Sequence, residues 1–533
     1  MHNKTRKAIL YAVGTIVLTQ IFFLASCKNH QNTTNILRMN IETEPESLDW
    51  SIATENWSIH VINNIMEGLA RYDDELNVTP ALASSWDVSA DGLKYRFHLR
   101  KNVKWTDGAP LVARHFVDSW KRLLDPATAA EYAYFLYDIK GAEDFNSGKI
   151  QSFSDVGVKA LDDYTLEVTL KNPVVYFPYL VTFVSTFPIR LDVIEKWGDN
   201  WTEPGHIVTL GAYKLESWRH EYRLTVVRNG SYYGKAPRIE KVEMFMVNEE
   251  NTALDLYDTN FLDIIRVPMH AIPYYRSRAG YVEGPAYWMY YLGFNIAKPP
   301  FDNPLVRRAF AHAIDRDEVV KVLRGGRAPW SSWIPPRMTG ENPDIGCRFD
   351  PGQARKLLKQ AGYESPEKFP EVTLGFNTLL QHTIIASNVQ EQWRANLGVN
   401  VRLDNMEWKV YLRKVHDDPP HIFRMGWVAD YPDPDSFMKV FISSSGNNFT
   451  RWESPVYDRL VDMAARERDP QKRQELYDKA QRLLLEEDCV IIPVFVSQIN
   501  RLVSPRIKGF KVNPMDLIFL ERLSFRQGGE AGG

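Results

Sequence analysis

Two short segments alternate strictly between apolar and polar residues, and this period of two limits the possible folds more than any other feature. The segments are Leu93–Arg100 and Thr165–Leu170. Such alternation is typical of an antiparallel strand with one face on a core and the other in water. Between them, Val112–Leu124 has helical spacing and is closed by Asp125-Pro126. The order predicts a mixed α/β chain of α+β type rather than a regular βαβ repeat.

Helical signals are stronger in the second half of the chain. Pro304 can occupy the first position of a helix, and Gly362 and Gly398 can end two others. The glycine at 398 leads directly into a strand, a helix-to-strand unit found in mixed sheets. The predicted elements are helices Gln353–Ala361, Ile384–Leu397 and Gln471–Glu487, and strands Ile36–Ile41, Val399–Leu403 and Val490–Val496.

The N-terminus has the pattern of a secretory leader. Three basic residues precede the apolar run Ala8–Phe23, and Leu24-Ala25-Ser26-Cys27 follows. This end resembles a bacterial lipobox, which implies a lipoprotein signal peptide at 1–26, a lipid on Cys27 and a polar tether at 27–35. An uncleaved membrane anchor is the alternative, because the run approaches the ~18 apolar residues of a membrane-spanning helix. Either way, most of the chain is expected outside the cytoplasm and held to a membrane.

Length, charge and cysteine content limit the number of domains and the kinds of partner that this chain can have. The chain has 533 residues, which is too many for one core and favours two to four domains. Loss of Lys4, Arg6 and Lys7 with the leader changes the formal charge from −3 to −6, which argues against nucleic acid as a partner. Cys347 and Cys489 could form a disulfide or remain unpaired. The 15 Trp, 25 Tyr and 26 Phe suit core packing, aromatic ligand clefts, or both.

Motifs for catalysis are missing from the linear sequence. The chain has no Gly-x-Ser-x-Gly elbow, no His-Glu-x-x-His pair, no phosphate-binding loop and no Cys-x-x-Cys. We therefore expect no enzyme, no metal site and no cofactor, although scattered side chains can still converge in space.

Landmarks along the chain resemble the family 5 extracellular solute-binding proteins, the capture subunits of peptide and nickel ABC importers. They are Glu44–Asp49, Met66–Leu69, Leu82–Trp86, Tyr95–Gly108, Gly211–Tyr213, Lys298–Arg307 and Ala361–Tyr363. The resemblance implies a two-lobed periplasmic-binding-protein type II fold with an inserted domain. In this division lobe I comprises 36–66, 189–290 and 496–533, the inserted domain comprises 67–188, and lobe II comprises 291–495.

The segment Arg424–Pro434 resembles the peptide-amine clamp of oligopeptide-binding proteins. The resemblance implies that Asp430 pairs with a free amino terminus. It also implies that Gly426, Trp427 and Val428, with the region around Glu55 across the cleft, bind the peptide backbone as an added strand. The alternatives are a turn residue for Asp430 and an exposed acid at a helix start for Glu55.

Cations are needed for the peptide carboxylate, at distances that grow by ~3.3 Å for each extended residue. Arg424 and His382 match family positions of this kind, whereas a further family arginine falls here on Val415. That departure leaves the preferred peptide length open. Trp408 and Tyr132 match cleft-wall aromatics. Surface or core roles are the alternatives for each of these residues.

The resemblance implies a monomeric, lipid-anchored receptor that binds an oligopeptide between its lobes and delivers it to an ABC permease. It would sit on the periplasmic side of a bacterial membrane, or on the cell surface of a Gram-positive organism. Dipeptides, cell-wall peptides, a nickel chelate or haem are alternative ligands, and a lipid-anchored hydrolase is an alternative from another class.

Overall fold

The computed structural model describes residues 35–323, 325–365 and 368–526. The predicted leader 1–26 and residues 27–34 of the tether, with Cys27, lie outside these ranges. The described residues from Leu37 onward form one compact unit. Within the described ranges, no helix combines the length and the apolar character that crossing a membrane requires.

The central element is an 11-stranded mixed sheet. Neighbouring strands are parallel at β1·β11, β14·β15 and β14·β16. They are antiparallel at β8·β9, β9·β10, β11·β17, β12·β16 and β12·β17. In sheet order the strands are β15 (Val401–Met406), β14 (Val372–Asn377), β16 (Ile422–Val428), β12 (Tyr281–Phe294), β17 (Ile491–Val503), β11 (Ile264–Arg266), β1 (Ile36–Asn40), β10 (Lys241–Phe245), β9 (Arg223–Arg228) and β8 (Tyr213–Arg219), with β13 (Arg327–Pro329) paired to β17.

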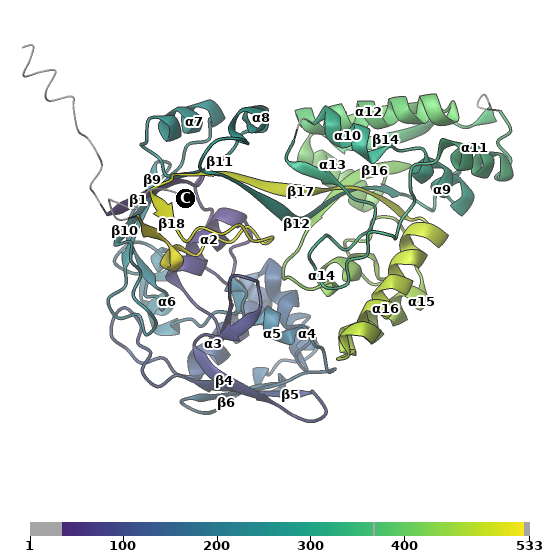
Figure 1. Cartoon of the computed structure of the whole chain (residues 1–533). Coiled ribbons are helices and arrows are strands. Elements are labelled where there is room, and N and C mark those ends of the chain that lie inside the picture. Colours follow the sequence, from purple (N-terminus) through teal and green to yellow (C-terminus); the bar gives the residue numbers. More distant parts are fainter. Residues whose placement is uncertain (1–34, 324, 366–367, 527–533) are drawn as a thin grey trace, which may run out of the picture. The chain divides into compact units, whose positions relative to one another are not determined.

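Strands β12 and β17 are long neighbours that connect the two halves of this sheet (Figure 1). β12 pairs with β16 at its C-terminal end, and β17 pairs with β11 at its own C-terminal end. Their pairing is interrupted by irregularities between Pro285 and Met289 and between Tyr290 and Tyr291. The boundaries predicted at 290/291 and 495/496 fall inside these strands, so the proposed lobes share a continuous pair of strands.

The two alternating segments form antiparallel strands, as predicted, and the structure places them next to each other. They are β5 (Lys94–Leu99) and β7 (Thr165–Thr169), paired antiparallel with Tyr95 opposite Val168 and Phe97 opposite Leu166. All four of these side chains are buried. β4 (Ala83–Val88) and β6 (Val158–Asp162) complete the four-stranded antiparallel sheet. The predicted helix beside it begins at Arg114 as α3 (Arg114–Leu124) and buries Phe116, Trp120 and Leu123.

The predicted helices are present, and the largest differences lie at the start of one and the end of another. α12 (Leu380–Leu397) begins four residues before Ile384. The sequence did not indicate this start, because Leu379 at the N-cap has no side chain that could cap the helix. α16 (Pro470–Arg482) is shorter than predicted and passes into a π-helical turn, Leu483–Glu487. The other helices are α2 (Asn56–Ile65), α4 (Ala142–Asn146), α5 (Phe177–Leu180), α6 (Leu191–Trp197), α7 (Glu250–Asp258), α8 (Ile272–Tyr275), α9 (Pro304–His312), α10 (Arg316–Val322), α11 (Pro351–Gln360), α13 (Trp408–Asp417), α14 (Asp435–Met438) and α15 (Pro455–Arg466).

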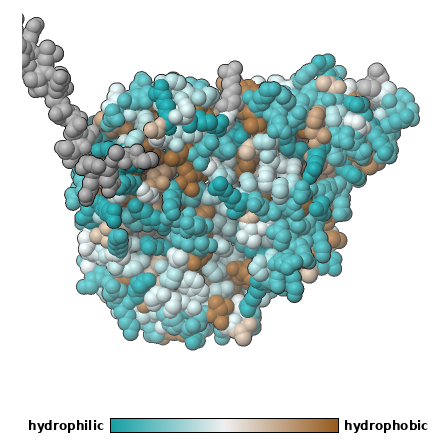
Figure 2. Space-filling view, viewed as in Figure 1, coloured by the Kyte–Doolittle hydropathy of each residue, from teal (hydrophilic) through white to brown (hydrophobic). Residues whose placement is uncertain are grey.

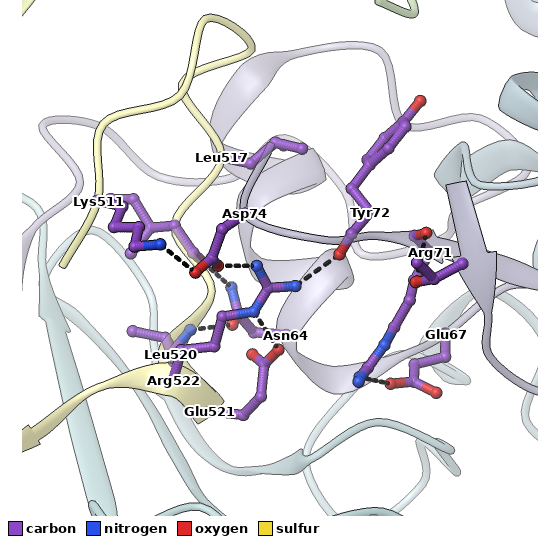
Figure 3. Close-up of polar contacts among 12 residues, drawn as sticks. Asn64, Glu67, Arg71, Tyr72, Asp74, Lys511, Leu517, Leu520, Glu521 and Arg522 are labelled. Carbon is purple, nitrogen blue, oxygen red and sulfur yellow. Dashed lines mark hydrogen bonds and ion pairs between the residues drawn. The ribbon is translucent and has the colours of Figure 1, made fainter. Parts of the chain in front are cut away.

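Polar contacts tie the C-terminal segment to residues 64–74 (Figure 3). Asp74 forms ion pairs with Arg522 and with Lys511, the latter at 2.7 Å. The backbone N–H of Leu520 donates to Asn64 Oδ1 at 2.9 Å. Within this segment, β18 (Ile507–Lys508) and β19 (Ser524–Phe525) pair as a short antiparallel ladder. These contacts join the C-terminal segment to Asn64, in the proposed lobe I, and to Asp74, in the proposed inserted domain.

Cys347 and Cys489 are free thiols in this structure, and both are buried. The Cys347 thiol donates to the Leu485 carbonyl at 3.4 Å. Hydrogen bonding with the Cys489 thiol is the largest influence on the pKa of Cys347, and it lowers that pKa. Of the two alternatives left by the sequence, the structure shows the unpaired one.

Candidate functional site

Strand β16 pairs with β12 along its whole length but with β14 only at its start. On the β12 side the partners run from Ile422–Phe294 to Val428–Trp288. On the β14 side only Ile422 and Phe423 have strand partners. In the described part of the chain, the edge of β16 from Met425 to Val428 therefore has no strand neighbour on that side. An edge of this kind can accept an added strand.

Gly426 lies in the middle of this edge. A Cβ at this position would come within 2.9 Å of Trp288 Nε1 and 3.1 Å of the Met289 carbonyl oxygen. The neighbouring Trp427 is held by its indole N–H, which donates to the Ser436 carbonyl at 2.7 Å. Val428 is 54% exposed. The strand edge is thus fixed from the β12 side and accessible at its end.

A cavity of about 190 Å³ lies beyond the end of β16. Its walls come from two segments that are distant in sequence, one within 134–180 and the other within 427–447. The lining residues are Tyr134, Phe135, Asp138, Tyr176, Leu180, Trp427, Asp430, Tyr431, Ser436, Lys439, Val440, Ser445 and Asn447. Aromatic rings therefore form much of the wall, whereas Trp50, Trp105, Trp120, Trp333 and Trp393 are fully buried in the cores.

Asp430 lines this cavity without a cationic partner. The Tyr134 hydroxyl donates to Oδ2 of Asp430 at 3.0 Å. No Lys, Arg or His among the described residues forms an ion pair with it. Burial raises the pKa of Asp430 to about 6, and the bond from Tyr134 opposes this shift. The site thus holds a desolvated carboxyl group that a cation would stabilise in its ionised form.

Lys439 shows the opposite situation in the same cavity. Its ammonium group lies 3.0 Å from Asp435 Oδ2 and 3.8 Å from Asp138 Oδ2, and it also donates to the Tyr176 hydroxyl. Its charge is already compensated. Lys439 is therefore a structural cation, and Asp430 is the acid that remains open to a ligand.

Arg424 on β16 and His382 on α12 both lie beside the ring of Tyr290. Arg424 Nη1 donates to Asn377 Oδ1 at 3.0 Å, and its guanidinium carbon lies 5.0 Å from the centre of the Tyr290 ring. The His382 ring lies 5.7 Å from the same ring. Burial, and then the charges of Arg424 and Arg327, lower the pKa of His382 to about 3, so this imidazole is neutral near pH 7.

The remaining predicted residues are placed as follows. Glu55 is the N-cap of α2 and accepts from the backbone N–H of Trp57 at 2.6 Å and of Ser58 at 2.5 Å. Its carboxylate therefore serves the helix start, which corresponds to the structural alternative for this residue. Trp408 begins α13 and is 42% exposed. Val415, on the same helix, is fully buried.

Tyr132 and Tyr134 share the 3₁₀ helix η2 (Glu131–Leu136). Tyr132 packs on Phe183 and Phe135, with ring centres 4.8 Å and 5.3 Å away. Only Tyr134 reaches the carboxyl group of Asp430. The sequence did not predict Tyr134, Asn377 or Arg327 as site residues, because no local pattern distinguishes them from other polar residues.

No group of three or more His, Cys, Asp or Glu is placed to hold a metal ion in the ranges that the structure describes. On the face shown in Figure 2, hydrophobic residues are gathered in small groups among hydrophilic ones. Such scatter is ordinary for a folded protein surface. The cavity beside Asp430 and the edge of β16 are therefore the features that most clearly point to a ligand.

Comparisons with known proteins agree on the family. The model of the bacterial extracellular solute-binding proteins, family 5, matches residues 77–449. The oligopeptide-binding protein OppA of Bacillus subtilis is 34% identical, with 94% of this chain and 96% of that protein covered. The unliganded open form of MppA, a periplasmic murein tripeptide binding protein, is similar with a TM-score of 0.81, 32% identity and coverage of 92% and 98%. OppA of Haemophilus influenzae in complex with RPPGFSPFR has a TM-score of 0.76, 31% identity and coverage of 92% and 99%.

Proposed function

The chain belongs to family 5 of the bacterial extracellular solute-binding proteins, and from this premise we propose that it captures oligopeptides for an ABC importer. It has the type II periplasmic-binding-protein fold of its structural relatives. Proteins of this family are receptors rather than enzymes, so the work of the site is binding. OppA of B. subtilis is named for oligopeptide binding, which supports the same class of ligand here.

The observation that carries the proposal is the uncompensated carboxyl group of Asp430 beside an open strand edge. A peptide has an α-ammonium group to pair with Asp430 and a backbone to pair with Gly426, Trp427 and Val428. Both groups are common to all peptides, so a receptor that uses them can accept many sequences. A nickel chelate or haem has no free α-ammonium group, and either would leave Asp430 unpaired.

The carboxyl end of the peptide is proposed to lie near Arg424 and His382. Neither side chain forms an ion pair with a described residue, and Arg424 is a permanent cation. Trp408 and Tyr132 are proposed cleft walls. The region around Glu55 is proposed to face the peptide through its backbone, because the carboxylate of Glu55 already caps α2.

We further propose that Cys27 carries the lipid anchor and that the loaded receptor docks on the permease as a monomer. The pattern Leu24-Ala25-Ser26-Cys27 supports the anchor. The proposed lobes are 36–66 with 189–290 and 496–533, the inserted domain 67–188, and 291–495. Closure around the ligand would involve β12 and β17, which connect the first and last of these parts.

Cell-wall peptides are a second candidate ligand, favoured by the similarity to MppA. Mass spectrometry of small molecules released from the natively purified protein distinguishes the candidates. Peptides of mixed sequence with free amino termini are the expected result. A single cell-wall fragment would favour the second candidate, and a ligand without an amine would contradict the proposal.

A further inference from the structure

Arg327 is a third basic residue beside Arg424 and His382. It begins β13, where Nη2 donates to Gln381 Oε1 at 2.9 Å and Nη1 makes longer bonds to the carbonyls of Gly325 and Gly326 at 3.4 and 3.3 Å. Gln381 precedes His382 on α12. The guanidinium group is therefore held against the first turn of that helix by neutral acceptors only.

Two stacked rings link the three basic residues. Phe495 and Tyr290 stack with their centres 4.7 Å apart and an angle of 20° between planes. Arg327 lies over Phe495, with its guanidinium carbon 5.7 Å from the ring centre, and Arg424 lies over Tyr290 at 5.0 Å. We call Arg327, His382 and Arg424 the basic cluster.

Within the described residues, no acid pairs with the basic cluster. Each member also has a buried nitrogen without a hydrogen-bond partner there, namely Arg327 Nε, Arg424 Nε and His382 Nδ1. His382 and Arg424 are 2% and 7% exposed. A buried guanidinium without a counter-charge is costly, because desolvation is not repaid by a partner.

The start of α12 adds to this positive potential. The helix has 18 residues, no side-chain cap and no acid in its first turn. Its N-terminus carries partial positive charge, and its first N–H groups have no partner within the helix. Gln381 and His382 belong to this first turn. The positive potential of the helix start therefore adds to that of the basic cluster.

We infer that the basic cluster receives two carboxylates, the α-carboxylate and the side-chain carboxylate of a C-terminal Asp or Glu, with Arg327 as the specificity-determining residue. This rests on the proposed peptide-binding function. One carboxylate can fully compensate one guanidinium, for which a bidentate pair is the preferred geometry. A second carboxylate on the same terminal residue would compensate the other.

Calorimetry on the full chain can test whether both carboxylates of the terminal residue contribute to peptide affinity. The probes are peptides of three to five residues of the form Ala(n)-Glu and Ala(n)-Gln, each as the free acid and as the C-terminal amide. At pH 7 the Ala(n)-Glu acid should bind at least about tenfold more tightly than the Ala(n)-Gln acid, as expected for a close charge pair. Its amide should also lose affinity, because one of the two charges is then missing.

Arg327→Gln should reduce the Glu-to-Gln preference to less than about threefold while leaving the affinity for the Ala(n)-Gln acid nearly unchanged. Lys321→Gln is the matched control, since Lys321 is an exposed cation on nearby α10 that pairs with Glu318. This control should keep the full preference. Equal losses for both peptides in Arg327→Gln would mean that Arg327 only positions β13 and would overturn the inference.

The wild-type protein tests the inference even if Arg327→Gln fails to fold. Equal affinity for the Glu and Gln acids at every length would overturn the inference and leave the proposed function intact. Binding of no peptide at any length would contradict the proposed function itself. The two failures are therefore distinguishable in one set of titrations.

Discussion

The hydroxyl group of Tyr134 donates a hydrogen bond of 3.0 Å to the carboxyl group of Asp430, across 296 residues of sequence. The bond joins η2 to the segment that follows β16. It is the one side-chain hydrogen bond that Asp430 receives from the described residues, and it cannot neutralise a carboxylate. The described residues therefore leave the carboxyl group of Asp430 without a counter-charge.

Asp430→Asn should weaken the binding of peptides with a free amino terminus by ~2–5 kcal/mol, because the ammonium would lose its counter-charge on enclosure. N-acetylated peptides should bind weakly to the wild type and lose little further in the variant. Calorimetry of both proteins with both peptide forms measures the coupling directly. Equal losses for the two forms would mean that Asp430 supports only the fold.

The same substitution should raise the thermal midpoint of the ligand-free protein at pH 7. The folded-state pKa of Asp430 is about 6 and lies above the ordinary value of 3.8. The folded protein thus binds the proton more tightly than the unfolded chain, and stability falls as pH rises between these two values. Asparagine removes this cost. A lower midpoint for the variant at pH 7, but not at pH 5, would contradict this electrostatic account.

Peptide affinity should fall by about tenfold between pH 7 and pH 5, because Asp430 with a pKa of about 6 must lose its proton to pair with the ammonium. Binding at pH 5 should release close to one proton, which is measured by calorimetry in buffers of different ionisation enthalpy. Asp430→Asn provides the control and should show neither effect. A flat affinity profile in the wild type would exclude Asp430 as the titrating group.

Tyr134→Phe should weaken binding of free-amine peptides by ~0.5–1.5 kcal/mol, since one hydrogen bond to the carboxylate is lost. It should also move the pH dependence to higher pH, because the Tyr134 bond lowers the pKa of Asp430. Tyr132→Phe is the matched control on the same 3₁₀ helix, where the ring packs on Phe183 and Phe135. Similar behaviour of both variants would show that general packing, rather than the bond to Asp430, is responsible.

Cys27→Ser should release the protein from the membrane fraction or leave the leader uncut, because the thiol at that position is the proposed acylation site. Fractionation and intact-mass measurement of the wild type and the variant check this. Recovery of wild-type protein that begins at residue 27 without a lipid mass would disprove the anchor.

The Cys347 and Cys489 thiols should resist alkylation in the native protein, because their exposed fractions are 6% and 0%. Unfolding without a reductant should allow both to react, and mass spectrometry of the Cys27→Ser chain should then show two adducts. No adducts after unfolding would indicate a disulfide instead.

Elements with local signals could be predicted from the sequence alone. The period-two segments became β5 and β7 because alternation places one set of side chains on a core whatever the surroundings. Pro304 begins a helix and Gly398 ends one in a left-handed backbone conformation, as their residue types suggest. The start of α12 at Leu380 was missed because it has no such signal. Motifs along the chain also sufficed for the family.

The charge compensation of the site residues could be seen only in the three-dimensional structure. Asp430 and Lys439 are both ionisable residues of one segment, yet Asp435 and Asp138 compensate Lys439 and no described cation compensates Asp430. Arg327 contacts Gln381 and Phe495, and no pattern in the sequence predicts these contacts. Desolvation and charge pairing depend on atoms that come from distant segments of the chain. The local sequence around a residue does not show which of these atoms will lie beside it.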